Sequence, residues 1–319
     1  MNRKIILIVT ILAVAFVLLA GIAVFGIFGT SANGRIVDKR TGKPVANASV
    51  RIGEKLGHTD KNGYYTLKVG QGNKEVMIKA TGYEVANFKV NVPIYFSANI
   101  GTSKIENGIV SGEVTEDIPL SHPVANLKVT LAGKEIKGDD KGRYTEYNVP
   151  VGSVMIVAEA PGYEKYEKKI TVRGGKNNFA VAMSLTPDST TMHYLEAIKQ
   201  RNFSFIYDTL HPDRQQQWGT KAEYISIKEQ QSNNFPMTIT AYAAQSPIML
   251  PSYTDPITGK TYENVARVPY SETAQSPLLA ILGMPEYTFA ASDYMVKVGG
   301  RWLSLGGGEP VDKSTEPVF

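Results

Sequence analysis

The stretch "KPVANASVRIG" (residues 43–53) returns as "HPVANLKVTLAG" (residues 122–133), so the word PVAN recurs at an offset of 79 residues (123 − 44). Each stretch opens near a proline and continues with alternating apolar and polar side chains, which is the pattern of a half-buried β-strand. A proline is tolerated at the start of a strand, because its missing N–H breaks no ladder hydrogen bond there. The repetition predicts that one β unit is present twice.

The duplication extends well beyond this word. "TDKNGYYTL" (59–67) corresponds to "DDKGRYTEY" (139–147), and "ATGYE" (80–84) corresponds to "APGYE" (160–164). The offset grows from 79 to 80 on the way, which predicts one extra residue in the second copy, a bulge between positions 144 and 147. Short strands separated by Asp, Asn and Gly turns predict two antiparallel sandwiches.

These sequence motifs resemble those of the carboxypeptidase regulatory-like, or prealbumin-like, family of β-sandwiches. The resemblance is carried by "GRIVDKRTGKPVANASVRI" (34–52), "HTDKNGYYTLKVGQG" (58–72) and "DDKGRYTEYNVPVG" (139–152), and it covers roughly residues 33–186. It implies modules that act as non-catalytic spacers or binding elements in extracytoplasmic proteins. Internal Lys–Asn crosslinks occur in related surface modules, but no residue triad here predicts one.

The N-terminal segment "IILIVTILAVAFVLLAGIAVFGIF" (5–28) carries no charge, and Thr10 is its one polar side chain. As a helix it would extend ~36 Å at ~1.5 Å per residue, enough for a hydrocarbon core of ~30 Å. The sequence therefore predicts a transmembrane helix over residues 5–29 behind a short cytoplasmic tip (1–4). It also predicts a single-pass cell-membrane protein with the bulk of the chain extracytoplasmic. Cleavage of a signal peptide after Ala32 stays open as an alternative, and the flanking charges do not choose the orientation.

Composition excludes several classes of function. The chain has no cysteine, which excludes disulfides, thiolate metal sites and cysteine nucleophiles. Its 34 basic and 30 acidic residues are scattered, so we expect no nucleic-acid partner. The turn at Asp60 and Asn62 offers too few oxygens for calcium. His193 and Glu196 have the spacing of a zinc pair, yet a third ligand is missing and both fall on the predicted solvent side of a helix. We expect no metal and no cofactor.

The hydrophobic period changes after residue 186. Three helices are expected in "MHYLEAIKQRN" (192–202), "NFSFIYDTL" (202–210) and "TKAEYISIKEQQ" (220–231), the last beginning at Thr220. Strands follow at residues 237–245, 261–272, 287–298 and 301–306. With "HYLEAIKQRNFSFIYDTLHPD" (193–213) in front and "DYMVKVGGRWLSL" (293–305) at the end, residues 187–319 resemble the nuclear transport factor 2-like superfamily. That resemblance implies a curved sheet and helices enclosing a cone, with enzymes, ligand binders and structural modules among its members.

Two groups of side chains are candidates for function in this part. The candidate ligand-binding residues, which could face the cone, are Tyr207, Asp208, Trp218, Tyr242, Asp293 and Tyr294. The candidate partner surface, which either plugs the cone as a short helix or forms an exposed apolar lip, consists of Leu278, Leu279, Ile281, Leu282 and Met284. An Asp beside a Tyr can exchange protons, but no histidine or arginine partner is evident, so no catalytic residue is predicted.

The predicted fold class is multidomain: an N-terminal transmembrane helix, two all-β sandwiches (30–106 and 107–186), and a C-terminal α+β cone of cystatin-like type (187–319) with a mobile tail. The predicted function is that of a non-catalytic, membrane-tethered envelope protein. Its sandwiches form a spacer for a terminal domain that binds a ligand, or a protein or cell-envelope partner. An enzyme acting on a small molecule in the cone and a structural subunit of a cell-envelope complex are the alternatives.

Overall fold

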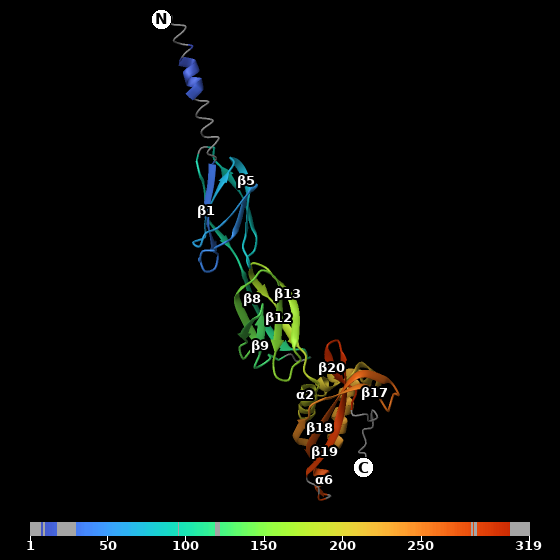
Figure 1. Cartoon of the computed structure of the whole chain (residues 1–319). Helices are drawn as coiled ribbons and strands as arrows, with labels where there is room; N and C mark the ends of the chain where they lie inside the picture. The colour runs from blue at the N-terminus through green and yellow to red at the C-terminus, as the bar shows by residue number, and fades with distance from the viewer. Residues whose placement is uncertain are drawn as a thin grey trace.

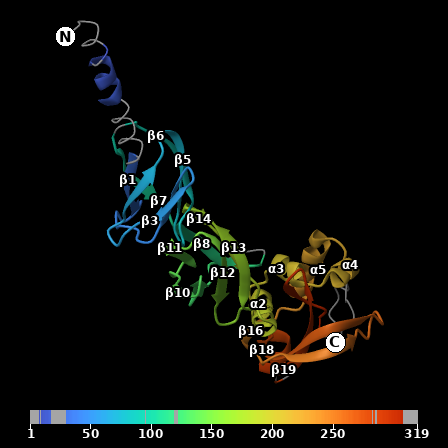
Figure 2. The same ribbon diagram turned by 45° about the horizontal axis from the view of Figure 1, so that its top comes forward.

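The computed structural model describes residues 8, 10–17, 30–94, 96–118, 122–281, 283 and 286–306. Three bodies follow one another along the described chain: two β-sandwiches and a unit that combines helices with a sheet (Figure 1). Figure 2, turned by 45°, shows the same serial order, with β1, β5 and β6 toward the N-terminal end and α2, α3, α4 and α5 toward the other.

The fold class and the location predicted from the N-terminal segment are wrong. Of residues 5–29 the structure describes Ile8 and residues 10–17, which are helical. No helix in the described part of the chain is both long enough and apolar enough to cross a membrane. The described chain is mostly β-strand, arranged in five sheets. An apolar composition shows that a segment is hydrophobic, but it does not determine the length of the helix that the segment forms.

The first sandwich packs a three-stranded sheet on a four-stranded one. The sheet in the order β4-β1-β7 consists of β4 (Tyr64–Val69), β1 (Thr30–Asp38) and β7 (Ala98–Ile105). The sheet in the order β3-β2-β5-β6 consists of β3 (Lys55–His58), β2 (Ser49–Ile52), β5 (Gly72–Lys79) and β6 (Ala86–Val92). The alternation in the PVAN stretch is borne out: Val50 and Ile52 are buried in the core while Arg51 between them is exposed. Burial of one strand face is what stabilises such a sandwich.

The second sandwich repeats this arrangement. One sheet, in the order β11-β8-β14, has β11 (Arg143–Val149), β8 (Gly108–Glu116) and β14 (Gly175–Asn178), and β15 (Val181–Met183) also pairs with β8. The other, in the order β10-β9-β12-β13, has β10 (Lys134–Lys137), β9 (Lys128–Leu131), β12 (Gly152–Glu159) and β13 (Tyr166–Val172). The extra residue lies slightly beyond the expected place. The register shifts between Tyr147 and Val149, and Asn148 has a φ of +60°.

One glycine in each copy explains why the two copies share the same turn motif. Gly63 and Gly142 have φ values of +78° and +70°. A Cβ on Gly63 would lie 2.4 Å from the carbonyl oxygen of Ile36, and one on Gly142 would lie 2.3 Å from that of Val114. Only glycine combines this backbone conformation with so close an approach.

The third unit packs helices on one face of a sheet. Its helices are α2 (Pro187–Lys199), α3 (Phe203–Thr209), α4 (Pro212–Trp218), α5 (Lys221–Asn234) and α6 (Pro277–Ile281). Its strands, in the order β16-β18-β19-β20 with β17 also paired to β18, are β16 (Thr238–Ala244), β17 (Ile248–Thr254), β18 (Thr261–Gln275), β19 (Glu286–Val298) and β20 (Arg301–Ser304). Helix α2 packs against β16 and β18. The predicted start of α5 is confirmed, because Thr220 forms a capping box with Glu223.

Short connections join the three bodies. Only Glu106 and Asn107 lie between β7 and β8, and only residues 184–186 lie between β15 and α2. The same loop binds the next body in the first copy and the connection to it in the second. The carbonyl oxygen of Gly82 accepts from Val151 N of the second sandwich at 3.2 Å, and that of Gly162 accepts from Thr186 N, the N-cap of α2, at 3.0 Å.

The glutamate of each repeated Gly-Tyr-Glu word strengthens these junctions. Glu84 accepts a hydrogen bond from Gly174 N in the second sandwich, at 2.7 Å. Glu164 accepts from Trp302 Nε1 in the third unit, also at 2.7 Å, and forms an ion pair with Lys297. The repeated Gly-Tyr-Glu motif therefore links each sandwich to the domain that follows it.

Candidate functional site

The six predicted ligand-binding residues do not converge on one place. Tyr207, Asp208 and Trp218 lie on helices α3 and α4, Tyr242 lies on β16, and Asp293 and Tyr294 lie on β19.

Two of these six residues, Tyr207 and Trp218, belong to an aromatic cluster between the helices. The Trp218 ring meets Tyr224 edge-on, with centroids 5.0 Å apart, and Tyr207 lies 5.5 Å from Tyr224. The Tyr207 hydroxyl donates to Gly219 O at 2.7 Å. Lys228 Nζ lies 4.5 Å from the centroid of the Trp218 ring, a cation–π distance. These rings form the core of the helical layer.

Two further predicted residues make contacts near the surface. Asp208 forms an ion pair with Lys221 at 2.5 Å. The Tyr242 hydroxyl donates to Glu196, and this hydrogen bond raises the pKa of Tyr242 to about 12 and lowers the pKa of Glu196. Lys199 lies over the Tyr242 ring. Both polar groups are therefore occupied by neighbours on the same unit.

Asp293 and Tyr294 point to opposite faces of the sheet, as neighbours in a strand do. Tyr294 stacks on Tyr253 with ring centroids 4.0 Å apart. Asp293 is 4% exposed and accepts from Ser304 Oγ at 2.6 Å, while its other oxygen, Oδ2, is buried and has no hydrogen-bond partner in the described chain. Burial raises the pKa of Asp293 to about 6.

Further titratable groups surround Asp293, and sequence reasoning missed them. Glu272 on β18 is buried, which raises its pKa. The pKa of Tyr194, from α2, is raised well above its usual value, first by burial and then by neighbours that include Tyr270, Glu272 and Asp293. Val268 pairs with Asp293 across the sheet, so the alternation of β18 could have placed Glu272 on the same face. Such protonatable groups can bind a polar ligand or exchange a proton.

Asp293 is buried, and two hollows lie away from it. A surface pocket of about 600 Å³ lies on the first sandwich, and its lining includes Arg51, Met77 and Lys89. A cavity of about 20 Å³ lies where the second sandwich meets the third unit, with Asp117 and His193 among its lining residues. The smaller cavity holds a water molecule at most, and it excludes an organic ligand.

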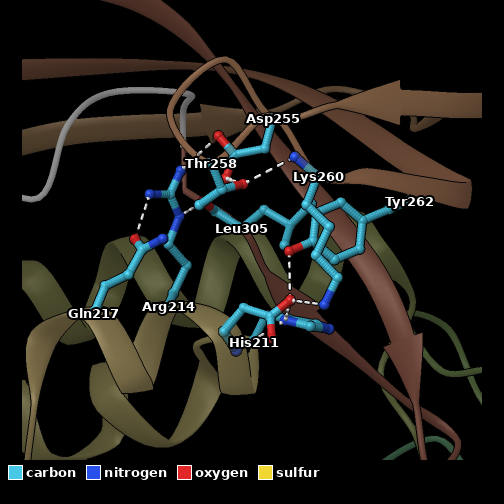
Figure 3. A network of polar contacts seen from close by, with 9 residues as sticks. His211, Arg214, Gln217, Asp255, Thr258, Lys260, Tyr262 and Leu305 are labelled. Carbon is cyan, nitrogen blue, oxygen red and sulfur yellow. Dashed lines mark hydrogen bonds and ion pairs between the residues drawn. The ribbon is translucent and has the colours of Figure 1, made fainter.

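A buried ion pair joins helix α4 to the β17–β18 hairpin (Figure 3). Arg214 Nη2 donates to Asp255 Oδ1 at 3.2 Å, and the two residues are 4% and 1% exposed. Arg214 also donates to Gln217 Oε1 at 2.8 Å and to the carbonyl oxygen of Leu305. Asp255 in turn accepts from Thr258 Oγ1 at 2.8 Å. Helix, hairpin and the residue after β20 are thereby held together.

A second set of contacts lies beside this pair (Figure 3). Asp213 Oδ2 accepts from Lys260 Nζ at 2.5 Å and from the Tyr262 hydroxyl at 2.6 Å, and these bonds lower the pKa of Asp213. The His211 ring meets Tyr262 edge-on at 5.2 Å, and burial lowers the pKa of His211. The arrangement is a structural clamp, because its polar atoms bind one another.

The predicted partner surface is described only in part. Leu278 and Leu279 belong to α6, and Leu282 and Met284 lie outside the described residues. Ile281 is 81% exposed, which fits the exposed lip rather than the plug. Figure 1 draws α6 at the end of the molecule remote from the N-terminus. Its role in binding stays a prediction.

Residues 32–115 match the family model described as CarboxypepD_reg-like domain. This finding confirms the predicted resemblance for the first copy of the repeat. The match ends within β8, the first strand of the second sandwich, and does not cover the rest of that sandwich or the terminal unit. No curated protein matches the chain.

Several solved structures are similar to part of the chain. The Bacillus anthracis TIE protein is 19% identical over 48% of this chain and 34% of its own, with a TM-score of 0.32. A type II cohesin–X-dockerin complex from Acetivibrio cellulolyticus is 28% identical over 25% of this chain and 59% of its own, with a TM-score of 0.22. The shaft pilin of Lactobacillus rhamnosus GG is 11% identical over 49% of this chain and 98% of its own, with a TM-score of 0.23. The chain thus spans about a third of the first of these proteins, and such likeness decides nothing about function.

Proposed function

We propose that the chain is a non-catalytic spacer in which two sandwiches (30–106 and 107–186) hold a terminal binding domain (187–319) at a distance. The observation that carries the proposal is the pair of short connections between consecutive domains, each stabilised by hydrogen bonds. Each connection is two or three residues long, and each Gly-Tyr-Glu loop bonds to the body that follows. Short, bonded connections restrict the relative motion of domains, which a spacer requires.

We further propose that the terminal domain, which resembles the nuclear transport factor 2-like superfamily, binds its ligand or protein partner through the surface around α6. Ile281 is 81% exposed and Tyr287, at the start of β19, is 50% exposed. The Tyr287 ring lies 6.3 Å from Phe289 in a stacked arrangement. Exposed aliphatic and aromatic side chains are typical of an interaction surface.

The spacer proposal predicts an extended particle in solution. A compact globule of 319 residues has a radius of gyration of about 20 Å. We expect small-angle X-ray scattering of the full chain to give a clearly larger value, because the three bodies are arranged in series. Light scattering on the same sample gives the mass. A radius near 20 Å would refute the spacer, and a strict monomer would refute a self-assembling structural subunit.

A second candidate function is proton-transfer chemistry on a small molecule at Asp293. The observation that favours it is the buried carboxyl group, whose pKa of about 6 lets it exchange a proton near neutral pH. The packing of Leu195, Val268 and Met295, each 0% exposed, argues against it, because a substrate needs space.

A further inference from the structure

One buried carboxylate lies at the contact between the second sandwich and the terminal unit, beside the contacts that Glu164 makes there. Glu116 ends β8, and its side chain is 6% exposed. Its Oε1 accepts from the Tyr163 hydroxyl at 2.5 Å, and its Oε2 lies 3.1 Å from His122 Nδ1. Burial alone would raise the pKa of Glu116, but hydrogen bonds from His193, Tyr163 and His122 lower it to about 2. The group is therefore a carboxylate at any pH near neutrality.

Helix α2 brings His193 to this carboxylate from the other side of the junction. His193 Nδ1 lies 2.9 Å from Ser189 O, and its Nε2 lies 3.5 Å from Glu116 Oε1. Both partners are hydrogen-bond acceptors. A neutral imidazole has a single N–H, so it serves one of them and turns a lone pair toward the other. Only the doubly protonated ring satisfies both contacts.

The other charges around His193 do not replace this contact. Asp117, from the second sandwich, and Arg301, at the start of β20, line the small cavity beside the ring and carry opposite charges. Glu164 is already paired with Lys297, and on α2 itself Glu196 binds the Tyr242 hydroxyl. The carboxylate of Glu116 is therefore the group whose contact with α2 depends on protonation of the ring.

We propose that the joint between the second sandwich and the terminal unit is pH-dependent, and that protonated His193 fastens it to Glu116. The proposal rests on the proposed spacer function and specifies how the reach of that spacer is regulated. The first junction provides an internal comparison. There Asn148 accepts from Arg40 and Asn107, and Glu84 accepts from a backbone N–H, so no donor in these bonds titrates near neutral pH.

The direction of the response follows from the charge. The hydrogen bond to Glu116 raises the pKa of His193 above its ordinary 6.5, despite partial burial. A raised pKa means that the folded chain binds the proton more tightly than the unfolded chain does. The contact is therefore complete below pH 6.5 and is lost as the pH rises through the higher value in the folded chain.

Distances between two spin labels test the proposal in the full chain. The chain has no native cysteine, so exposed positions can be labelled selectively after Lys168→Cys and Glu263→Cys, which lie on either side of the second junction. We expect the distance distribution to be narrow at pH 5.5 and to broaden at pH 8.5. Labels at Lys68→Cys and Lys168→Cys, across the first junction, are expected to give the same distribution at both values.

Two variants assign the response to one ring. His193→Gln removes the titrating group, and we expect the broad distribution at both pH values. His122→Gln is the matched control, because His122 also contacts Glu116 but belongs to the same sandwich, and we expect it to keep the response. An unchanged distribution in the parent chain, or a response that survives His193→Gln, would overturn the proposal.

An NMR titration of the His193 ring covers the case in which a variant does not fold. We expect its pKa above 6.5 in the parent chain, and a value at or below 6.5 would overturn the proposal. The radius of gyration separates this test from that of the spacer. A large radius with an unresponsive second junction refutes the pH-dependent joint alone, whereas a radius near 20 Å refutes the spacer itself.

Discussion

Replacing Arg214 with alanine is expected to lower the free energy of unfolding of the terminal unit by about 3–5 kcal/mol. The change leaves the carboxylate of Asp255 buried at 1% exposure without its guanidinium partner. Leu305 O and Gln217 also lose their donors. Urea denaturation followed by tryptophan fluorescence measures the loss, because both tryptophans of the chain, Trp218 and Trp302, lie in this unit.

Lys260→Ala is the matched control for this prediction. Lys260 also forms an ion pair in the same clamp, with Asp213, but its side chain is 54% exposed. Solvent screens such a pair, so we expect a loss below about 1 kcal/mol. Equal losses for the two variants would show that burial is not what makes the Arg214 pair important.

Replacing Asp293 with asparagine is expected to stabilise the terminal unit above pH 6. Because the pKa of Asp293 rises from 3.8 to about 6 on folding, the folded chain holds a proton that the unfolded chain has released. The stability of the parent therefore falls as the pH rises through this interval, by about 3 kcal/mol at ~1.4 kcal/mol per pH unit. Asparagine keeps the acceptor for Ser304 and has no charge to bury.

Denaturation curves at pH 4 and pH 7.5 check this expectation. We expect the parent to lose stability between these values and Asp293→Asn to lose much less. Part of the slope stays, because burial also raises the pKa of Glu272. Asp208→Asn serves as the control, since Asp208 is partly exposed and loses its ion pair with Lys221, and we expect no gain in stability from it. A parent that is equally stable at both values would contradict the assignment.

Local patterns were sufficient to predict many of the strands and several turns. Alternation in the repeated stretches identified the buried faces of β2 and β9, and Thr220 identified the start of α5. The N-terminal prediction assumed that the whole uncharged run forms one helix, and no helix among the described residues is long and apolar enough to cross a membrane. The bulge was placed too early, since the sequence shows that a residue is added but does not show where the chain kinks, which is at Asn148.

The contacts that build the site could not be predicted, because they join segments far apart in the chain. Asp293 was recognised, but its partner Ser304 follows a hairpin, and Asp255 reaches Arg214 from another element. His193 was assigned to the solvent side of its helix, and it contacts Glu116 of the neighbouring sandwich instead. Periodicity distinguishes the polar side of a helix from its apolar side, but it does not show which other body covers that polar side.

Under the spacer proposal, each copy of the repeat adds a fixed length to the chain. Each copy carries, at the end nearer the next body, the residues that bind that body or the connection to it: Gly82 and Glu84 in the first copy, Gly162 and Glu164 in the second. Duplicating one copy in the gene would therefore add a fixed increment of reach together with its own fastening. Unequal recombination between the two PVAN repeats would remove one repeat and shorten the spacer by the length of that repeat.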